Sequence, residues 1–503
     1  MPLACIKLNH NVRLTLAYSF VLSVASSLLS QTPLASFILL LTQDTNGVPS
    51  DGGAQDNLAV GIATGIQGIV NLLCAVPAGV LADRFGRQVM LRAASCTLVV
   101  ACCFLTICLT VVQHFFSDAV LFYCLLGSSA LFGIFMGLHS APLEALFGDS
   151  VASGSRSRLY VWRSSLRTAG NAVGPLVSIG VFLGLGDTWS MGELRVVLLA
   201  GVGLAVLPAL TLWLFRDAHA LGAASEGLLS ADAARAAAVG EEATAAQRAA
   251  AAAPPRRVCG VLSAASIAPV VALSDLLSML GSGMTIKFFG LFFWVDLKLP
   301  PAAVSALYVA GPLGIAACGL LAQRLSLRIG RLQTTLLCKA SGIALLVTIG
   351  RLDLNAGGTR RVAAIVIPLY LVRTWLMNCT AGLTKSVLND YVPKRHRAKW
   401  NSLESLNVFS WSGSAALGGL LIDRLNYQAT FLITAALQGV SMLCLVPLLL
   451  LVHAETGGRG GVGGDSADSR AVRPEEVSAT TAPMNERLLG GEGATTSTAG
   501  RRG

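Results

Sequence analysis

The chain has 503 residues, of which 54% are hydrophobic and 13% are charged, and its formal net charge is +10 at pH 7. A soluble domain carries about 25% charged residues, so this composition excludes an ordinary soluble enzyme or regulatory domain. A basic chain can bind nucleic acid, but here the basic residues lie in short turns between long apolar segments, which argues against that function.

Apolar segments recur along the chain, and each is close to the length of about 20 residues that a helix needs to cross a bilayer. The hydrocarbon offers backbone groups no hydrogen-bond partners, so each segment is expected to be helical. The first segment has no convincing cleavage site, and we interpret it as a retained helix rather than a signal peptide. Twelve spans are predicted in chain order, at residues 14–41, 58–82, 89–111, 120–146, 159–185, 194–215, 267–294, 303–322, 332–349, 362–383, 403–422 and 429–451.

The turns on one side of this predicted bundle hold about twice as many Lys and Arg residues as the turns on the other side. Basic turns remain in the cytoplasm when a membrane protein inserts, so both termini are predicted to be cytoplasmic.

These segments divide the chain into four predicted parts. Residues 216–262 are rich in Ala with mixed charges, and residues 453–503 are rich in Gly, Ser, Thr and Glu. Such compositions do not form a packed core. We therefore predict an N-terminal six-helix bundle at 1–215, a cytoplasmic central linker at 216–262, a C-terminal six-helix bundle at 263–452 and a disordered cytoplasmic tail at 453–503.

Two loop sequences of the first half are echoed in the second half. The stretch GVLADRFGRQVML at 79–91 is echoed by GLLAQRLSLRIGR at 319–331, and FGDSVASGSRSR at 147–158 is echoed by LNDYVPKRHRAK at 388–399. Two echoes at nearly the same separation indicate two parallel repeats of six helices. Transporters built in this way bind their solute between the two related bundles.

The first of these loops resembles the signature between helices 2 and 3 of the major facilitator superfamily. The matching residues are Gly79, Leu81, Ala82, Asp83, Arg84, Gly86, Arg87 and Leu91. The resemblance covers residues 10–452, in helix count, loop positions and internal repeat. It implies the twelve-helix fold of that family. In the second half Gln323 replaces the acid, so that copy of the motif is degenerate.

In the family, the acid at the position of Asp83 latches the cytoplasmic ends of the two halves in the outward-facing state. Arg87 and the N-terminus of a helix that begins near residues 400–403 are its two candidate partners. Glu144 and Asp149 are expected to complete the charge cluster. The alternative interpretation is a basic turn that only sets topology.

The fifth span contains GNAVGPLVSIG at 170–180, which is similar to a helix 5 pattern of proton-coupled antiporters in the same superfamily. Gly170, Gly174 and Pro175 fit this pattern, whereas Ser178 and Ile179 stand where a glycine pair is expected. Close helix packing explains these residues equally well. The Gly61, Gly65 and Gly68 stripe of the second span is interpreted as packing.

Charged residues inside a span are costly, so each needs a partner or a function. Asp275 of the seventh span shares a helix face with Ser278 and Ser282, and Lys287 lies on another face. Gly281 and Gly283 of the same span are expected to let the helix bend in mid-membrane. Arg373 is near the centre of the tenth span. A structural ion pair is the alternative role for Asp275 and Arg373, and outward snorkelling is the alternative for Lys287. The substrate or coupling candidates are Gln31, Asp275, Ser278, Ser282, Lys287, Arg373 and Thr380.

The sequence thus predicts a secondary transporter that moves a small solute by alternating access, with protons as the coupling ion and antiport favoured over symport. The alternatives are a non-transporting receptor or scaffold on the same fold, and a lipid translocator. No enzyme signature, nucleotide loop or metal-ligand cluster is found, so no cofactor or metal is expected. The expected partners are the lipid bilayer and the solute. We expect a monomeric multi-pass protein of the plasma membrane or an endomembrane.

Overall fold

A computed structural model describes residues 8–30, 32–45, 57–151, 156–221, 266–354, 358–384 and 403–450. These residues are helical with short connections, and they include no strand. Within these ranges, eleven helical stretches are long and apolar enough to cross a membrane, and α17 (Leu403–Arg424) adds a further helix of 22 residues. The predicted all-helical membrane fold is confirmed. The cytoplasmic position of the termini stays a prediction.

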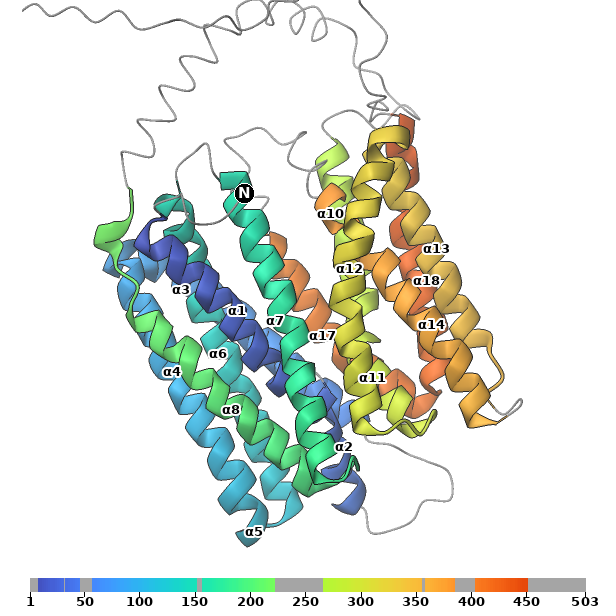
Figure 1. Ribbon diagram of the computed structural model, residues 1–503, viewed down its shortest axis with the longest axis horizontal. Coiled ribbons are helices and arrows are strands. Elements are labelled where there is room, and N and C mark those ends of the chain that lie inside the picture. The colour runs from blue at the N-terminus through green and yellow to red at the C-terminus, as the bar shows by residue number, and fades with distance from the viewer. Residues whose placement is uncertain are drawn as a thin grey trace, which may run out of the picture. The chain divides into compact units, whose positions relative to one another are not determined.

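The first half of the chain supplies one group of helices (Figure 1). Each predicted span has a helical counterpart, and the third span ends in a short π turn at Cys108–Val112. The helices are α1 (His10–Ser30), α2 (Thr32–Thr45), α3 (Asn57–Phe85), α4 (Arg87–Ile107), α5 (Gln113–Phe115), α6 (Asp118–Ser150), α7 (Arg156–Leu185) and α8 (Met191–Trp213).

The second half supplies the other group. Its first span is interrupted between Gly283 and Ile286, close to the bend that Gly281 and Gly283 led us to expect. The helices are α10 (Ile267–Gly283), α11 (Ile286–Val295), α12 (Pro301–Ile329), α13 (Arg331–Arg351), α14 (Thr359–Asn378), α17 and α18 (Tyr427–Leu445), followed by a 3-10 turn at Val446–Leu450.

The internal repeat is visible in the backbone. Helices α3 and α12 have 29 residues each, and α4 and α13 have 21 residues each. A single glycine with positive φ joins each pair, Gly86 at 92° and Gly330 at 100°, a conformation that a side chain would strain. Gly86 therefore corresponds to Gly330. This alignment of the two halves is shifted by about one helical turn from the alignment of the repeated loop sequences, which pairs Gly79 with Gly319.

The two groups of helices meet mainly along two pairs of elements. Helix α17 packs along α3, and α12 packs along α7. Helix α11 also contacts α2 in the lower part of Figure 1. The pairs α3–α17 and α7–α12 each join the second span of one half to the fifth span of the other. Each half therefore contributes its second and its fifth span to the boundary.

The predicted division into two bundles, a linker and a tail stays a prediction. Residues 222–265 and 451–503 lie outside the described residues. The first residues of the predicted linker form a 3-10 turn, Asp217–His219, against the first half. There the side chain of Asn9 donates a 2.6 Å hydrogen bond to the carbonyl of His219.

Candidate functional site

The first and last residues of α3 and α12 define two ends of the molecule. We call the end where these helices finish, at Phe85 and Ile329, the motif end, and the end where they start, at Asn57 and Pro301, the closed end. At the motif end, Asp83 and Arg84 are exposed, and so are Gln323 and Arg324 at the degenerate second copy. A Cβ added to Gly79 would meet no atom within 4 Å.

The remaining charged residues of the predicted gating cluster form ion pairs inside the first half. Arg87 pairs with Asp149 rather than with Asp83, and Glu144 pairs with Arg163 at 2.7 Å. The carboxylate of Asp217 caps α4 by accepting the N–H of Gln88 at 3.1 Å, and it lies 3.0 Å from a Cβ built on Gly86. Residues 400–402 lie outside the described residues. The latch role of Asp83 therefore stays a prediction.

The helix 5 motif lies where α7 crosses α1. A Cβ on Gly170 would lie 2.5 Å from the carbonyl oxygen of Phe20, and one on Gly174 would overlap the side chain of Ser27. Pro175 lies within α7. The two glycines thus let two backbones approach closely, which is the packing interpretation of the motif.

The glycine stripe of α3 serves the same purpose between the halves. A Cβ on Gly61 would lie 2.5 Å from the carbonyl oxygen of Ala415, and one on Gly68 would overlap Ser412. Gly65 has more room, with 3.8 Å to the Cβ of Ala416. The stripe therefore fixes how closely α17 approaches α3.

Asp275 of α10 faces a basic residue that the sequence analysis did not single out. Lys339 of α13 is only 6% exposed, and its Nζ lies 3.9 Å from Oδ1 of Asp275. A single lysine in the middle of the predicted span 332–349 was a usable signal, by the same rule that drew attention to Asp275. Ser278 is half-buried, and Ser282 accepts a 3.1 Å hydrogen bond from Nε2 of Gln438, a second polar residue that was missed.

Arg373 of α14 is buried, with 3% of its surface exposed. Its guanidinium lies over the ring of Phe289, 5.4 Å from the centroid, and its Nε has no hydrogen-bond partner among the described residues. Thr380 is buried as well, and its carbonyl accepts the hydroxyl of Thr384 at 3.3 Å. Gln31 lies outside the described residues.

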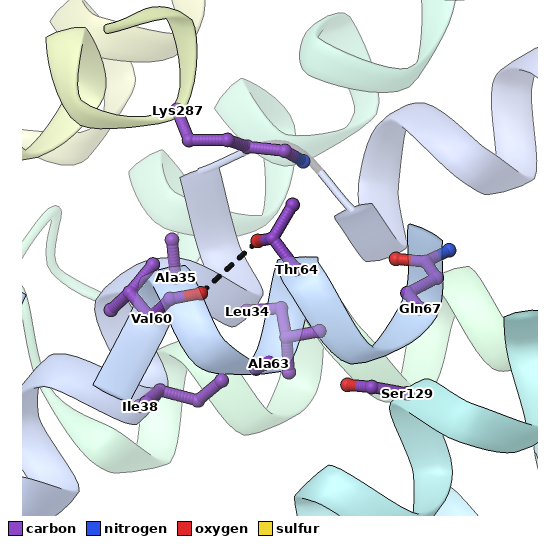
Figure 2. A pocket seen from close by; sticks show the side chains of 9 residues that line it. All are labelled: Leu34, Ala35, Ile38, Val60, Ala63, Thr64, Gln67, Ser129 and Lys287. Carbon is purple, nitrogen blue, oxygen red and sulfur yellow. Dashed lines mark hydrogen bonds between the residues drawn. The ribbon is translucent and has the colours of Figure 1, made fainter. Parts of the chain in front are cut away.

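Lys287 is placed differently, at the boundary between the halves. It extends from α11 toward Thr64 and Gln67 of α3 (Figure 2). Its ammonium lies 5.6 Å from the ring centroid of Trp411. The pocket that it lines encloses about 20 Å³, room for about one water molecule. Its other lining residues come from the first half, namely Leu34, Ala35, Ile38, Val60, Ala63 and Ser129.

Comparisons with known proteins agree with this architecture. The sequence model described as Major Facilitator Superfamily matches residues 19–348. A search of curated proteins finds no match. Among solved structures, a bacterial homologue of the iron transporter ferroportin in an inward-facing state is similar, with a TM-score of 0.59 at 13% identity over 87% of this chain and 98% of that chain.

Two further structures share the fold at low identity. A D-xylose-proton symporter gives a TM-score of 0.63 at 13% identity, covering 86% of this chain and 96% of that one. The human organic anion transporter MFSD10 (TETRAN) gives 0.53 at 14% identity, covering 86% of this chain and 98% of that one. From the family match, the internal repeat and the shared fold, we conclude that this chain belongs to the major facilitator superfamily.

Proposed function

We propose that the protein is a secondary transporter that moves a small solute by alternating access. The observation that carries this proposal is the asymmetry between its two ends. Hydrogen bonds and close glycine contacts join the halves at the closed end, whereas Asp83 and Arg84 of the family motif are exposed at the other. Such a state is one of the two that a rocking mechanism alternates between.

The charge of the interior favours an anionic solute. Away from the helix ends, the described spans of the second half carry the basic residues Lys287, Lys339 and Arg373 and the single carboxylate Asp275. An excess of positive charge inside the membrane is stabilised when an anion binds. Lys287 lines a pocket at the boundary, so we propose that it contacts an organic anion or an anionic amphiphile.

Proton coupling is proposed through Asp275 and Lys339. Protonation of the carboxylate would remove the charge that faces a buried ammonium, so the two protonation states would favour different helix positions. The helix 5 resemblance favours exchange with protons over symport. The driving force would then be the proton gradient.

A flux screen in proteoliposomes tests this function. The purified protein is reconstituted and challenged with a panel of organic anions and matched neutral analogues, with and without an imposed pH gradient. Saturable flux of an anion, lost in Lys287→Gln and retained in the exposed control Lys298→Gln, is expected. No flux of any solute in either direction would instead favour a receptor on the same fold, and flux of labelled lipids alone would favour a lipid translocator.

A further inference from the structure

Two aspartates at the closed end each reach from one half of the molecule to the first turn of a helix in the other half. Asp423 lies in the last turn of α17. Its Oδ2 accepts the backbone N–H of Leu58 at 2.8 Å, and its Oδ1 accepts the backbone N–H of Asn57 at 3.0 Å. The Asn57 side chain donates a further 3.0 Å bond to Oδ1 and accepts the hydroxyl of Tyr427 at 2.9 Å.

Asp187, just beyond the end of α7, makes the corresponding contact in the opposite direction. Its Oδ1 accepts the backbone N–H of Ala302 at 2.8 Å. Pro300 and Pro301 precede Ala302 and have no N–H, so Ala302 supplies the first backbone donor of α12. Beside this contact the indole of Trp189 donates a 2.8 Å hydrogen bond to the carbonyl of Leu299 and stacks on Trp294.

The two contacts are equivalent under the internal repeat. Leu58 and Ala302 are the second residues of α3 and α12, which match in length and in the glycine that follows each. The aspartates come from the C-terminal ends of α7 and α17, the fifth long helix of each half. The same interaction therefore joins the halves twice. In each case a carboxylate of one half lies at the positive N-terminus of a helix in the other half.

We propose that Asp187 and Asp423 are gating residues, a pair of charge clamps that together hold the closed end shut during the transport cycle. The clamps differ from the family latch at Asp83, because they lie at the opposite end of α3 and α12 and would stabilise the opposite state. Opening this end requires both carboxylates to leave their helices. This inference rests on the alternating access proposed above, but its test uses no flux.

Hydrogen–deuterium exchange on the full chain tests the proposal. Asp423→Ala removes one clamp, and Asp187→Gly removes the other, glycine being chosen because Asp187 has a φ of 54°. If the two halves did not move, removing a helix cap would raise hydrogen exchange only at the N-terminus of the capped helix. A gate held by both clamps opens as a unit, so Asp423→Ala should raise exchange about fivefold or more at Ala302 as well as at Leu58, and Asp187→Gly should do the converse.

Asp118→Asn is the matched control, since Asp118 lies in the first turn of α6 at the same end but within one half. It should leave exchange at Leu58 and Ala302 unchanged. Increases confined to the helix whose own cap was removed, or no increase at all, would overturn the proposal. If either truncation fails to fold, Asp423→Asn and Asp187→Asn, which keep an acceptor but lose the charge, give the same comparison with smaller increases.

Discussion

The carboxylate of Asp423 accepts the backbone N–H of Leu58 at 2.8 Å, although 365 positions separate the two residues in the chain. This contact and its counterpart between Asp187 and Ala302 locate the closed end of the molecule. Both use backbone N–H donors at the start of a helix. Under the proposed alternating access, these contacts would break when the halves rock.

Gly61→Ala should destabilise the closed end. The new Cβ would lie 2.5 Å from the carbonyl oxygen of Ala415 and 2.8 Å from the Cα of Ala416, and both are backbone atoms that cannot turn aside. We expect a loss of about 1–3 kcal/mol, seen as a lower apparent melting temperature in detergent. Gly65→Ala, with 3.8 Å of room, is the control and should be neutral or stabilising because alanine favours helix. Equal effects of the two substitutions would show that α17 does not pack on α3 in this way.

Asp275→Asn should destabilise the second half, because it leaves the ammonium of Lys339 buried without its carboxylate. The Asp275 side chain is 31% exposed and the pair is 3.9 Å apart, so we expect about 1–3 kcal/mol, less than for a fully buried pair. The double variant Asp275→Asn with Lys339→Gln should recover part of this loss. A double-mutant cycle of melting temperatures measures the coupling, and strict additivity would mean that the two residues do not interact.

Asp296 should make stability depend on pH. It lies just beyond α11, outside the spans, and burial raises its pKa from 3.8 to about 6 while Lys298 acts in the opposite direction. The folded protein therefore binds this proton more tightly than the unfolded chain, and the associated stability is present at low pH and lost as pH rises through about 6. Melting temperature should fall between pH 5 and 7, and Asp296→Asn should flatten that slope. The exposed control Asp353→Asn should keep it, and an unchanged slope in Asp296→Asn would refute the assignment.

Asp83→Asn should slow transport without destabilising the state described here. Asp83 is exposed in this state, and its predicted latch contact would form only in the opposite state. The change in stability should stay within about 0.5 kcal/mol, the range of surface substitutions. Asp149→Asn is the contrast, since it breaks the ion pair with Arg87 and should lower the melting temperature. Initial rates in Asp83→Asn close to those of the wild type would remove the latch from the mechanism.

Much of the fold could be predicted from the sequence, because long apolar segments have one stable form in a bilayer. The break between α10 and α11 was also foreseeable from Gly281 and Gly283. The π turn at Cys108–Val112 was not, because it is a shift in hydrogen-bond pattern without a distinctive residue. The alignment of the two halves predicted from the sequence differs by one helical turn from the alignment of their backbones. The sequence alignment matched similar residue types, whereas the backbones correspond at Gly86 and Gly330.

The candidate site was less predictable, because helix rotation decides which neighbour a charged side chain meets. Asp275 stood out in the sequence, but its partner Lys339 did not, and Arg373 lies over Phe289 inside the second half. The solute and coupling roles of these residues stay predictions. Asp187 and Asp423 had no signature in the sequence, because the partner type that they share is a backbone N–H group.

Distances across both ends of the molecule test alternating access most directly. Spin labels at the exposed positions Phe85 and Leu327 span the motif end, and labels at Tyr123 and Leu425 span the closed end. Pulsed electron paramagnetic resonance in lipid bilayers, with and without a mixture of organic anions and at two pH values, should show two populations. Alternating access predicts that the distance at one end shortens as the distance at the other end lengthens. A single unchanging distance at each end under every condition would contradict it.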